Sequence, residues 1–196
     1  TAYEILTCDW SSDVCSSDLT EIELMHNCIF LLNAGHDTTA MLISNGLELL
    51  FRFPDQMRRL RDEPSLMRTA IEEMLRYEPP IIFLSRIALA DSEVAGVPLR
   101  KGELFHLGLA SANRDPERYP DPDRFDVGRD DGKHLSFGWG MHFCMGASIA
   151  RMEGRVAFET LLQRFAKIEL TGPPPRWAPA TALRTLERFP VRLVSA

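Results

Sequence analysis

The sequence predicts a mainly α-helical fold with small β-sheets beside the helices, an α+β class. Apolar runs with helix start and stop signals fill residues 20–77 and 145–164, a pattern typical of buried helices. Short apolar pieces separated by glycines lie between these two regions and favour strands. With 196 residues, of which 45% are hydrophobic and 26% charged, the chain can bury one good core.

The first expected helix begins after Thr20. Thr20 and Glu23 have the spacing of a capping box, and apolar residues then recur until Pro54 ends the run. Because this helix is apolar nearly all round, it is expected to be buried. Two further helices are expected over residues 54–62 and 64–77, the second of them ended by a pair of prolines.

The region after the third helix predicts short strands and one more helix. Four strands are expected, over residues 85–89, 93–94, 97–99 and 103–107. Residues 113–133 form a long polar loop dense in proline and aspartate, and loops of this length in a compact domain are usually functional. Another helix is expected over residues 145–164, followed by a last short hairpin near residues 184–194.

Charge and hydropathy exclude two classes of partner. The net charge of −6 argues against a nucleic-acid partner. No apolar run of bilayer-spanning length is free of charges or turn residues, and no signal peptide opens the sequence, so no membrane partner is expected. The four cysteines lack the spacing of a disulfide framework, which predicts a reducing, cytoplasmic setting.

Residues 1–19 have no helical or strand period and are rich in serine and aspartate. Codons can be chosen so that the run DWSSDVCSSDL follows a sequencing-library adapter, and the whole segment therefore resembles a translated adapter. The native sequence is expected to begin at about Thr20, with residues 20–196 carrying the fold. A disordered tail is the alternative for the first segment.

Cys144 lies in a stretch of unusual composition, FGWGMHFCMG at residues 137–146. Glycines at 138, 140 and 146 allow sharp turns and let the backbone approach a flat ligand closely. The following helix would favour a negative charge on the sulfur through its dipole and its free N–H groups. This arrangement suits an anionic sulfur held as a metal ligand, whereas the alternative is an inert buried cysteine.

Three motifs in order resemble those of the cytochrome P450 family. The stretch F-G-x-G-x-H-x-C-x-G at residues 137–146 is similar to its heme-binding signature, residues 34–39 (AGHDTT) to its oxygen-activation motif, and Glu73–Arg76 to its E-x-x-R motif. The resemblance covers about Thr20 to the end, roughly the C-terminal half of a usual member. It implies the C-terminal, heme-binding part of the P450 fold and a heme b cofactor with Cys144 as the axial iron ligand.

The resemblance also assigns residues around the heme. Phe137 would pack near the sulfur and Gly138 would let the loop approach the ring, although Phe137 is equally suited to plain core packing. His142 and Arg86 would bind the heme propionates, because a carboxylate needs a fixed cationic or N–H donor. The alternatives are a structural histidine and a solvated arginine at a strand edge.

Asp37 and Thr38 are polar residues in the middle of the first apolar helix. A threonine hydroxyl can donate to the carbonyl four residues earlier, and nearby Gly35 weakens the helix, so a local opening is expected there. The resemblance implies that Thr38 steadies the oxygen ligand and that Asp37 relays protons from solvent. The alternative is a hydrogen-bonded polar pair inside a core helix.

Glu73 and Arg76 are three residues apart on one expected helix and can therefore pair. The resemblance implies a buried network with Arg124 of the polar loop that fixes the geometry of the cysteine loop. A surface salt bridge of little energetic consequence is the alternative.

The resemblance implies a heme-thiolate monooxygenase that inserts one atom of O2 into an apolar small-molecule substrate. Electrons would come from a ferredoxin and ferredoxin reductase, docking on Arg129, Lys133, Arg151 and Arg155, unless these form only a solvated surface. Residues 81–84 and 181–183 would face the substrate, or else belong to the core. A heme-binding fragment without turnover is one alternative, and a peroxide-driven or rearranging heme-thiolate enzyme is another.

Overall fold

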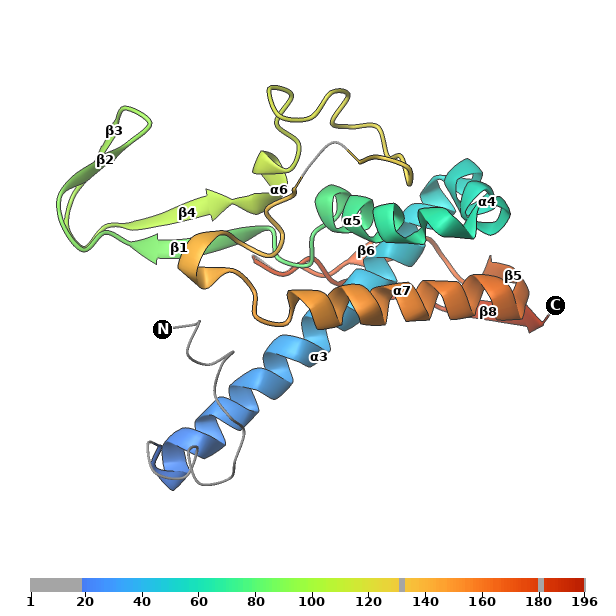
Figure 1. Ribbon diagram of the computed structural model, residues 1–196, viewed down its shortest axis with the longest axis horizontal. Coiled ribbons are helices and arrows are strands. Elements are labelled where there is room, and N and C mark those ends of the chain that lie inside the picture. The colour runs from blue at the N-terminus through green and yellow to red at the C-terminus, as the bar shows by residue number, and fades with distance from the viewer. Residues whose placement is uncertain (1–18, 131–132, 180–181, 196) are drawn as a thin grey trace.

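The computed structural model describes residues 19–130, 133–179 and 182–195 (Figure 1). Most of residues 1–19, and Thr181 among the expected substrate contacts, therefore lie outside the described residues. The described helices are α3 (Glu21–Arg52), α4 (Pro54–Asp62), α5 (Met67–Tyr77), α6 (Leu109–Ala112) and α7 (Ala147–Arg164), with 3-10 turns at Pro64–Leu66 and Gly140–His142. The expected mainly α class with small β-sheets is confirmed.

The strands form two-stranded antiparallel sheets, and these are the bounds of their members: β1 (Phe83–Ile87) with β4 (Leu104–Gly108), β2 (Ser92–Val94) with β3 (Val97–Leu99), β5 (Phe165–Leu170) with β8 (Val191–Ser195), and β6 (Arg176–Trp177) with β7 (Leu186–Arg188). The hairpin expected near residues 184–194 is wrong, because β7 and β8 each pair with an earlier strand instead of with each other. Only Phe189 and Pro190 separate them, and this pair lacks the residues that a two-residue hairpin turn requires.

The core lies where the second half of α3 meets α5 and α7 (Figure 1). Leu42, Ile71 and Phe158, one from each of these helices, are almost fully buried. Two glycines allow the helices to approach closely. A Cβ on Gly46 would lie 2.8 Å from Cζ of Phe158, and one on Gly154 would lie 3.0 Å from Cδ2 of Leu42. The close packing of these three helices forms the scaffold that positions the candidate functional residues.

The first half of α3 is exposed, which corrects the expectation that the whole helix is buried. The predicted capping box is present: the Glu23 amide donates to the Thr20 hydroxyl, and the Glu23 carboxylate accepts from the Thr20 amide at 2.8 Å. However, Ile22, Phe30 and Leu32 are each more than 60% exposed, and the start of the helix projects away from the core (Figure 1). Its apolar surface therefore has no covering element among the described residues.

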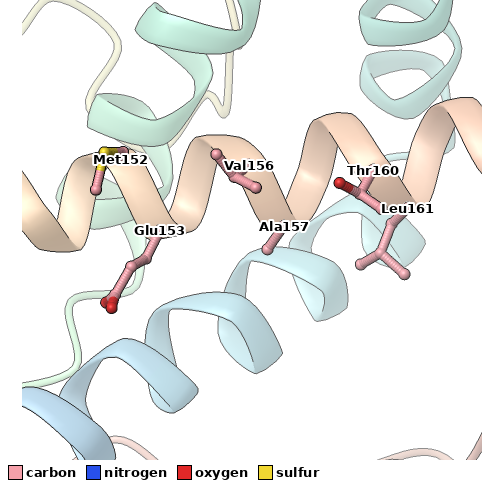
Figure 2. Close-up of a pocket in the computed structure, with 6 residues that line it drawn as sticks. All are labelled: Met152, Glu153, Val156, Ala157, Thr160 and Leu161. Carbon is pink, nitrogen blue, oxygen red and sulfur yellow. The ribbon is translucent and has the colours of Figure 1, made fainter.

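A shallow hollow runs along α7 beside α3 (Figure 2). Its lining comes from α7 alone and is mostly apolar, with Met152, Glu153, Val156, Ala157, Thr160 and Leu161. None of these is a candidate functional residue. Within the described ranges, no helix combines the length and the apolar character needed to cross a membrane.

Candidate functional site

The Cys144 loop is folded by glycines at two turns. Gly138 and Gly140 have φ angles of 72° and 68°, in the left-handed region that only glycine adopts without cost. A Cβ on Gly138 would also lie 3.3 Å from the carbonyl oxygen of His142. The Cys144 amide donates to the Phe137 carbonyl at 2.8 Å and closes the loop. The geometry therefore explains why glycine occupies position 138.

The Cys144 side chain is a free, exposed thiol just ahead of α7. Its neighbours in sequence are apolar and exposed: Trp139 is 69% exposed and Met145 is 71% exposed, and Phe143 and Ile149 are about half exposed. Sulfur is a soft metal ligand, and exposed aromatic and aliphatic side chains offer apolar contact to a flat organic group. The donor set and its surroundings therefore fit a heme bound through its iron to Cys144.

His142 and Arg86 lie on different elements. His142 ends the 3-10 turn before Cys144 and is exposed. Arg86 is in β1, half-buried, and its Nη1 donates to the carbonyl of Ser85 at 2.9 Å. Neither side chain forms an ion pair with another described residue, so the Arg86 guanidinium and the His142 imidazole are both available to a carboxylate ligand.

Asp37 and Thr38 lie near the middle of α3, which continues as a helix on both sides. The Thr38 hydroxyl donates to the Ala34 carbonyl at 2.7 Å, as the sequence predicts. The Asp37 carboxylate is 2.9 Å from Nδ1 of His36, and both of these side chains are exposed to solvent. No hydrogen bond or ion pair of the described residues joins this pair to the Cys144 loop.

Glu73 and Arg76 form a buried ion pair, as the resemblance implied, and not the surface salt bridge that was the alternative. Their side chains are 1% and 3% exposed, and Arg76 donates from Nε and Nη2 to the two carboxylate oxygens at 2.6 and 2.9 Å. The third partner is Arg129, whose Nε is 3.3 Å from Glu73. The expected third partner, Arg124, is wrong: its side chain is largely exposed and pairs with Asp126, and only its backbone carbonyl joins the network.

The same network reaches the Cys144 loop through Asn113. Arg76 donates from Nη1 to the Asn113 carbonyl at 2.8 Å. The Asn113 side chain accepts from the Leu135 amide at 2.8 Å and donates to the Ser136 hydroxyl at 2.9 Å. Leu135 and Ser136 directly precede Phe137. The buried pair on α5 thus anchors the start of the loop that carries Cys144.

Phe137 is packed by two residues, and a third binds them; the sequence interpretation did not join these three. The Arg151 guanidinium lies 4.4 Å from the centre of the Phe137 ring, and the His134 ring lies 5.6 Å from it. Glu72 of α5 binds Arg151 at 2.7 and 2.9 Å. The only signal in the sequence was that Glu72 adjoins the E-x-x-R motif. Nothing local indicated that α5 and α7 would meet over this ring.

The family-level comparison agrees with this fold. The cytochrome P450 family model matches residues 7–185, a range that begins inside the segment expected to be non-native. The chain therefore belongs to the cytochrome P450 family. Members of this family use a heme whose iron is ligated by a cysteine.

Curated relatives and solved structures match across most of this chain. The biotin biosynthesis cytochrome P450 of Bacillus subtilis (strain 168) is 46% identical over 88% of the chain and 44% of that protein. The cytochrome P450 monooxygenase PikC of Streptomyces venezuelae is 42% identical over 93% of the chain and 44% of that protein. A crystal structure of P450BioI with a hexadec-9Z-enoic acid-ligated acyl carrier protein superposes with a TM-score of 0.85 at 45% identity, covering 89% of this chain and 46% of that one. The chain thus spans less than half the length of these relatives.

Proposed function

We propose that the protein carrying this chain is a heme-thiolate monooxygenase in which Cys144 is the axial ligand of heme b. The observation that carries the proposal is the free, exposed thiol on a glycine-turned loop, surrounded by exposed apolar side chains and anchored from behind by a buried ion-pair network. The curated relative PikC, named a monooxygenase, supports oxygenation over a peroxide-driven or rearranging reaction.

Each residue has a separate role in this proposal. Cys144 supplies the sulfur ligand, and the N-terminus of α7 favours its negative charge. His142 and Arg86 hold the propionates through charge-assisted hydrogen bonds. Phe137 and Gly138 shape the loop beneath the ring. A heme bound there would supply the oxygen activation by which one atom of O2 enters the substrate and the other leaves as water, with electrons from the proposed donor.

Asp37 and Thr38 move and hold protons in this proposal. Asp37, whose carboxylate is exposed, would relay protons from solvent toward the oxygen ligand beside Thr38. The Thr38 hydroxyl now donates to the Ala34 carbonyl. Rotation about its χ1 angle would redirect that donor to a ligand beside α3.

The proposal includes an apolar small-molecule substrate and a ferredoxin-type electron donor. The half-buried apolar residues 81–84 support an apolar substrate, and the exposed Leu183 lies beside Ile81 in an isolated β-bridge. Docking of the electron donor is supported by Lys133 and Arg155, which are exposed. Arg129, by contrast, is 10% exposed and bound to Glu73, so its assignment to the docking face is wrong. We also propose that residues 1–19 are non-native, that residues 20–196 form the C-terminal heme-binding portion, and that the protein is cytoplasmic.

The chain offers a matched pair of cysteines to test the heme ligand. Cys28 and Cys144 are both free and exposed. In the full-length, heme-loaded protein, Cys144→Ser should abolish the thiolate-type Soret band of the carbonmonoxy-ferrous form, because a serine oxygen is a poor substitute for thiolate sulfur. Cys28→Ser should retain the band. A thiolate-type band that persists in Cys144→Ser would refute the assignment.

The proton relay is tested through coupling. Thr38→Ala should divert electrons from product to peroxide or water, because it removes the hydroxyl, whereas Thr38→Ser keeps the hydroxyl and should stay coupled. Asp37→Asn should slow turnover and make its solvent isotope effect larger. Coupling in Thr38→Ala equal to that of the wild type would contradict the role of this hydroxyl.

A further inference from the structure

Three charged or titratable side chains from three separate segments meet behind the Phe137 ring. We call three side chains the Glu72 cluster: Glu72 of α5, His134 of the segment just before Phe137, and Arg151 of α7. Glu72 accepts two hydrogen bonds from Arg151, from Nε at 2.7 Å and from Nη2 at 2.9 Å. Nε2 of His134 lies 3.2 Å from the same carboxylate, and this imidazole is 2% exposed. The cluster therefore clamps one arginine in a fixed plane.

The fixed plane matters because the Arg151 guanidinium covers the Phe137 ring at 4.4 Å. A guanidinium in this position is attracted to the face of the ring, and a two-point carboxylate contact restricts its rotation. The centre of the Phe143 ring lies 6.3 Å from that of the Phe137 ring. The Phe137 ring therefore contacts both the cluster and an aromatic residue next to Cys144.

The backbone of Phe137 transmits this restraint to Cys144. Its carbonyl accepts the Cys144 amide at 2.8 Å, which is the hydrogen bond that closes the loop. A shift of the ring would therefore shift the acceptor of the Cys144 amide. Arg151 also reaches the start of α7, where its Nη1 lies 3.5 Å from the Ala147 carbonyl.

Hydrogen bonds and charge keep Glu72 ionised. Burial by itself raises the pKa of Glu72, but hydrogen bonds from His134 and Arg151, together with the charge of Arg151, outweigh it and lower the pKa to about 2. Glu72 is therefore anionic at any physiological pH and offsets the charge of Arg151. Without Glu72, the positive charge of Arg151 would stabilise negative charge on the Cys144 sulfur and the reduced form of the iron, and would therefore raise the reduction potential.

We propose that Arg151, clamped by Glu72 and His134 against the Phe137 ring, is a positioning residue that fixes the Cys144 loop and, with Glu72, sets the reduction potential of the iron bound there. The inference rests on the proposed function, because it requires heme at Cys144. It assigns the E-x-x-R helix a second role: Glu73 holds the buried network, while the adjacent Glu72 binds the arginine that covers the Phe137 ring.

Arg151→Lys tests the positioning role in the full-length, heme-loaded protein. Lysine keeps the charge but lacks the planar fork that binds both carboxylate oxygens and stacks on the ring. We expect heme affinity to fall by about 10-fold or more, as is usual when a partner of a metal ligand is lost, and the thiolate-type Soret band to weaken. Arg164→Lys is the matched control, since Arg164 is exposed on the same helix, and it should behave like the wild type.

Glu72→Gln tests the electrostatic role. The amide keeps the shape of the side chain but removes its charge, so the positive charge of Arg151 is no longer offset and the reduction potential should rise. Glu153→Gln removes the same charge from an exposed position of α7 and should leave the potential unchanged. Spectroelectrochemical titration measures both.

Two readouts separate the possible results. If the variants lower the free energy of unfolding but keep the heme affinity, Soret band and potential of the wild type, Arg151 is only structural and the inference is wrong. If the wild-type holoprotein itself lacks a thiolate-type band, the proposed function is wrong, and this result does not depend on the variants. A loss of affinity in Arg151→Lys together with a raised potential in Glu72→Gln would establish both parts.

Discussion

The buried ion pair of α5 gives the sharpest test of what holds the loop scaffold together. Arg76→Ala removes the two hydrogen bonds to Glu73, at 2.6 and 2.9 Å, together with those from Nη1 to the carbonyls of Asn113 and Pro122, at 2.8 and 2.9 Å. The two side chains are 1% and 3% exposed, and Asn113 is fully buried, whereas the bond to Pro122 is only partly buried. The substitution therefore leaves a buried carboxylate and a buried carbonyl short of partners.

The expected cost follows from the remaining contacts. Breaking a buried pair by removing one partner costs about 3–5 kcal/mol, and each unsatisfied carbonyl adds about 1–3 kcal/mol where water cannot enter. Glu73 keeps Arg129 at 3.3 Å and the Asp126 amide at 3.0 Å, which offsets part of this cost. We therefore expect a loss of about 3–5 kcal/mol in the free energy of unfolding.

The matched control is an exposed pair on α7. Arg155 lies 3.7 Å from Glu159, and the two side chains are 55% and 37% exposed. Arg155→Ala should cost no more than about 0.5 kcal/mol. Urea unfolding followed by circular dichroism measures both variants, with the m-values compared to verify that the same surface is exposed. A loss below about 1 kcal/mol for Arg76→Ala would refute the claim that this pair is desolvated.

Three further changes have clear expected outcomes. Gly46→Ala should destabilise the protein by about 1–3 kcal/mol in thermal unfolding, because its Cβ would press on Phe158 in the core; Gly35→Ala on the same helix, which meets nothing within 4 Å, should not. Burial raises the pKa of Glu48. At pH values just above the ordinary carboxyl pKa, the folded protein therefore holds a proton on Glu48 that the unfolded protein has lost, and the free energy of unfolding falls as the pH rises through this range. Glu48→Gln should therefore be the more stable protein at neutral pH in urea titrations, with the advantage vanishing in acid; a less stable variant at neutral pH would contradict this. Thr20→Ala should cost about 1 kcal/mol of helix stability, seen as faster amide exchange in the first turn of α3, and unchanged exchange would mean that the capping box is not formed.

Local features of the fold could be predicted from the sequence because their causes are local. The start of α3 follows from Thr20 and Glu23, which satisfy each other's donors within one turn. The bounds of α4 are those expected, since Pro54 occupies the first turn where a missing N–H costs nothing. The turn between β2 and β3 is set by Gly96, with a φ of 80°.

Long-range pairings could not be predicted in this way. β5 and β8 are separated by twenty residues, and no pattern within either strand indicates the partner. Arg124 and Arg129 are both arginines of the same polar loop, and only the path of the folded backbone brings Arg129 to Glu73. For the same reason, the meeting of Glu72, His134 and Arg151 over Phe137 was invisible in the sequence.

The distribution of polar and apolar side chains also indicates what kind of ligand the Cys144 loop takes. The polar groups that support the loop lie behind it, where Asn113 and the buried Arg76 bind one another, so they are already satisfied. The side chains beside the thiol are instead exposed and apolar, with Trp139 and Phe143 the largest. A bare zinc ion needs about four protein ligands in a structural site, whereas a metal held in a flat organic ring needs one axial ligand and apolar contact on its faces. A rigid thiol with apolar neighbours meets the second requirement, and this is the physical reason that heme, rather than a free ion, suits Cys144.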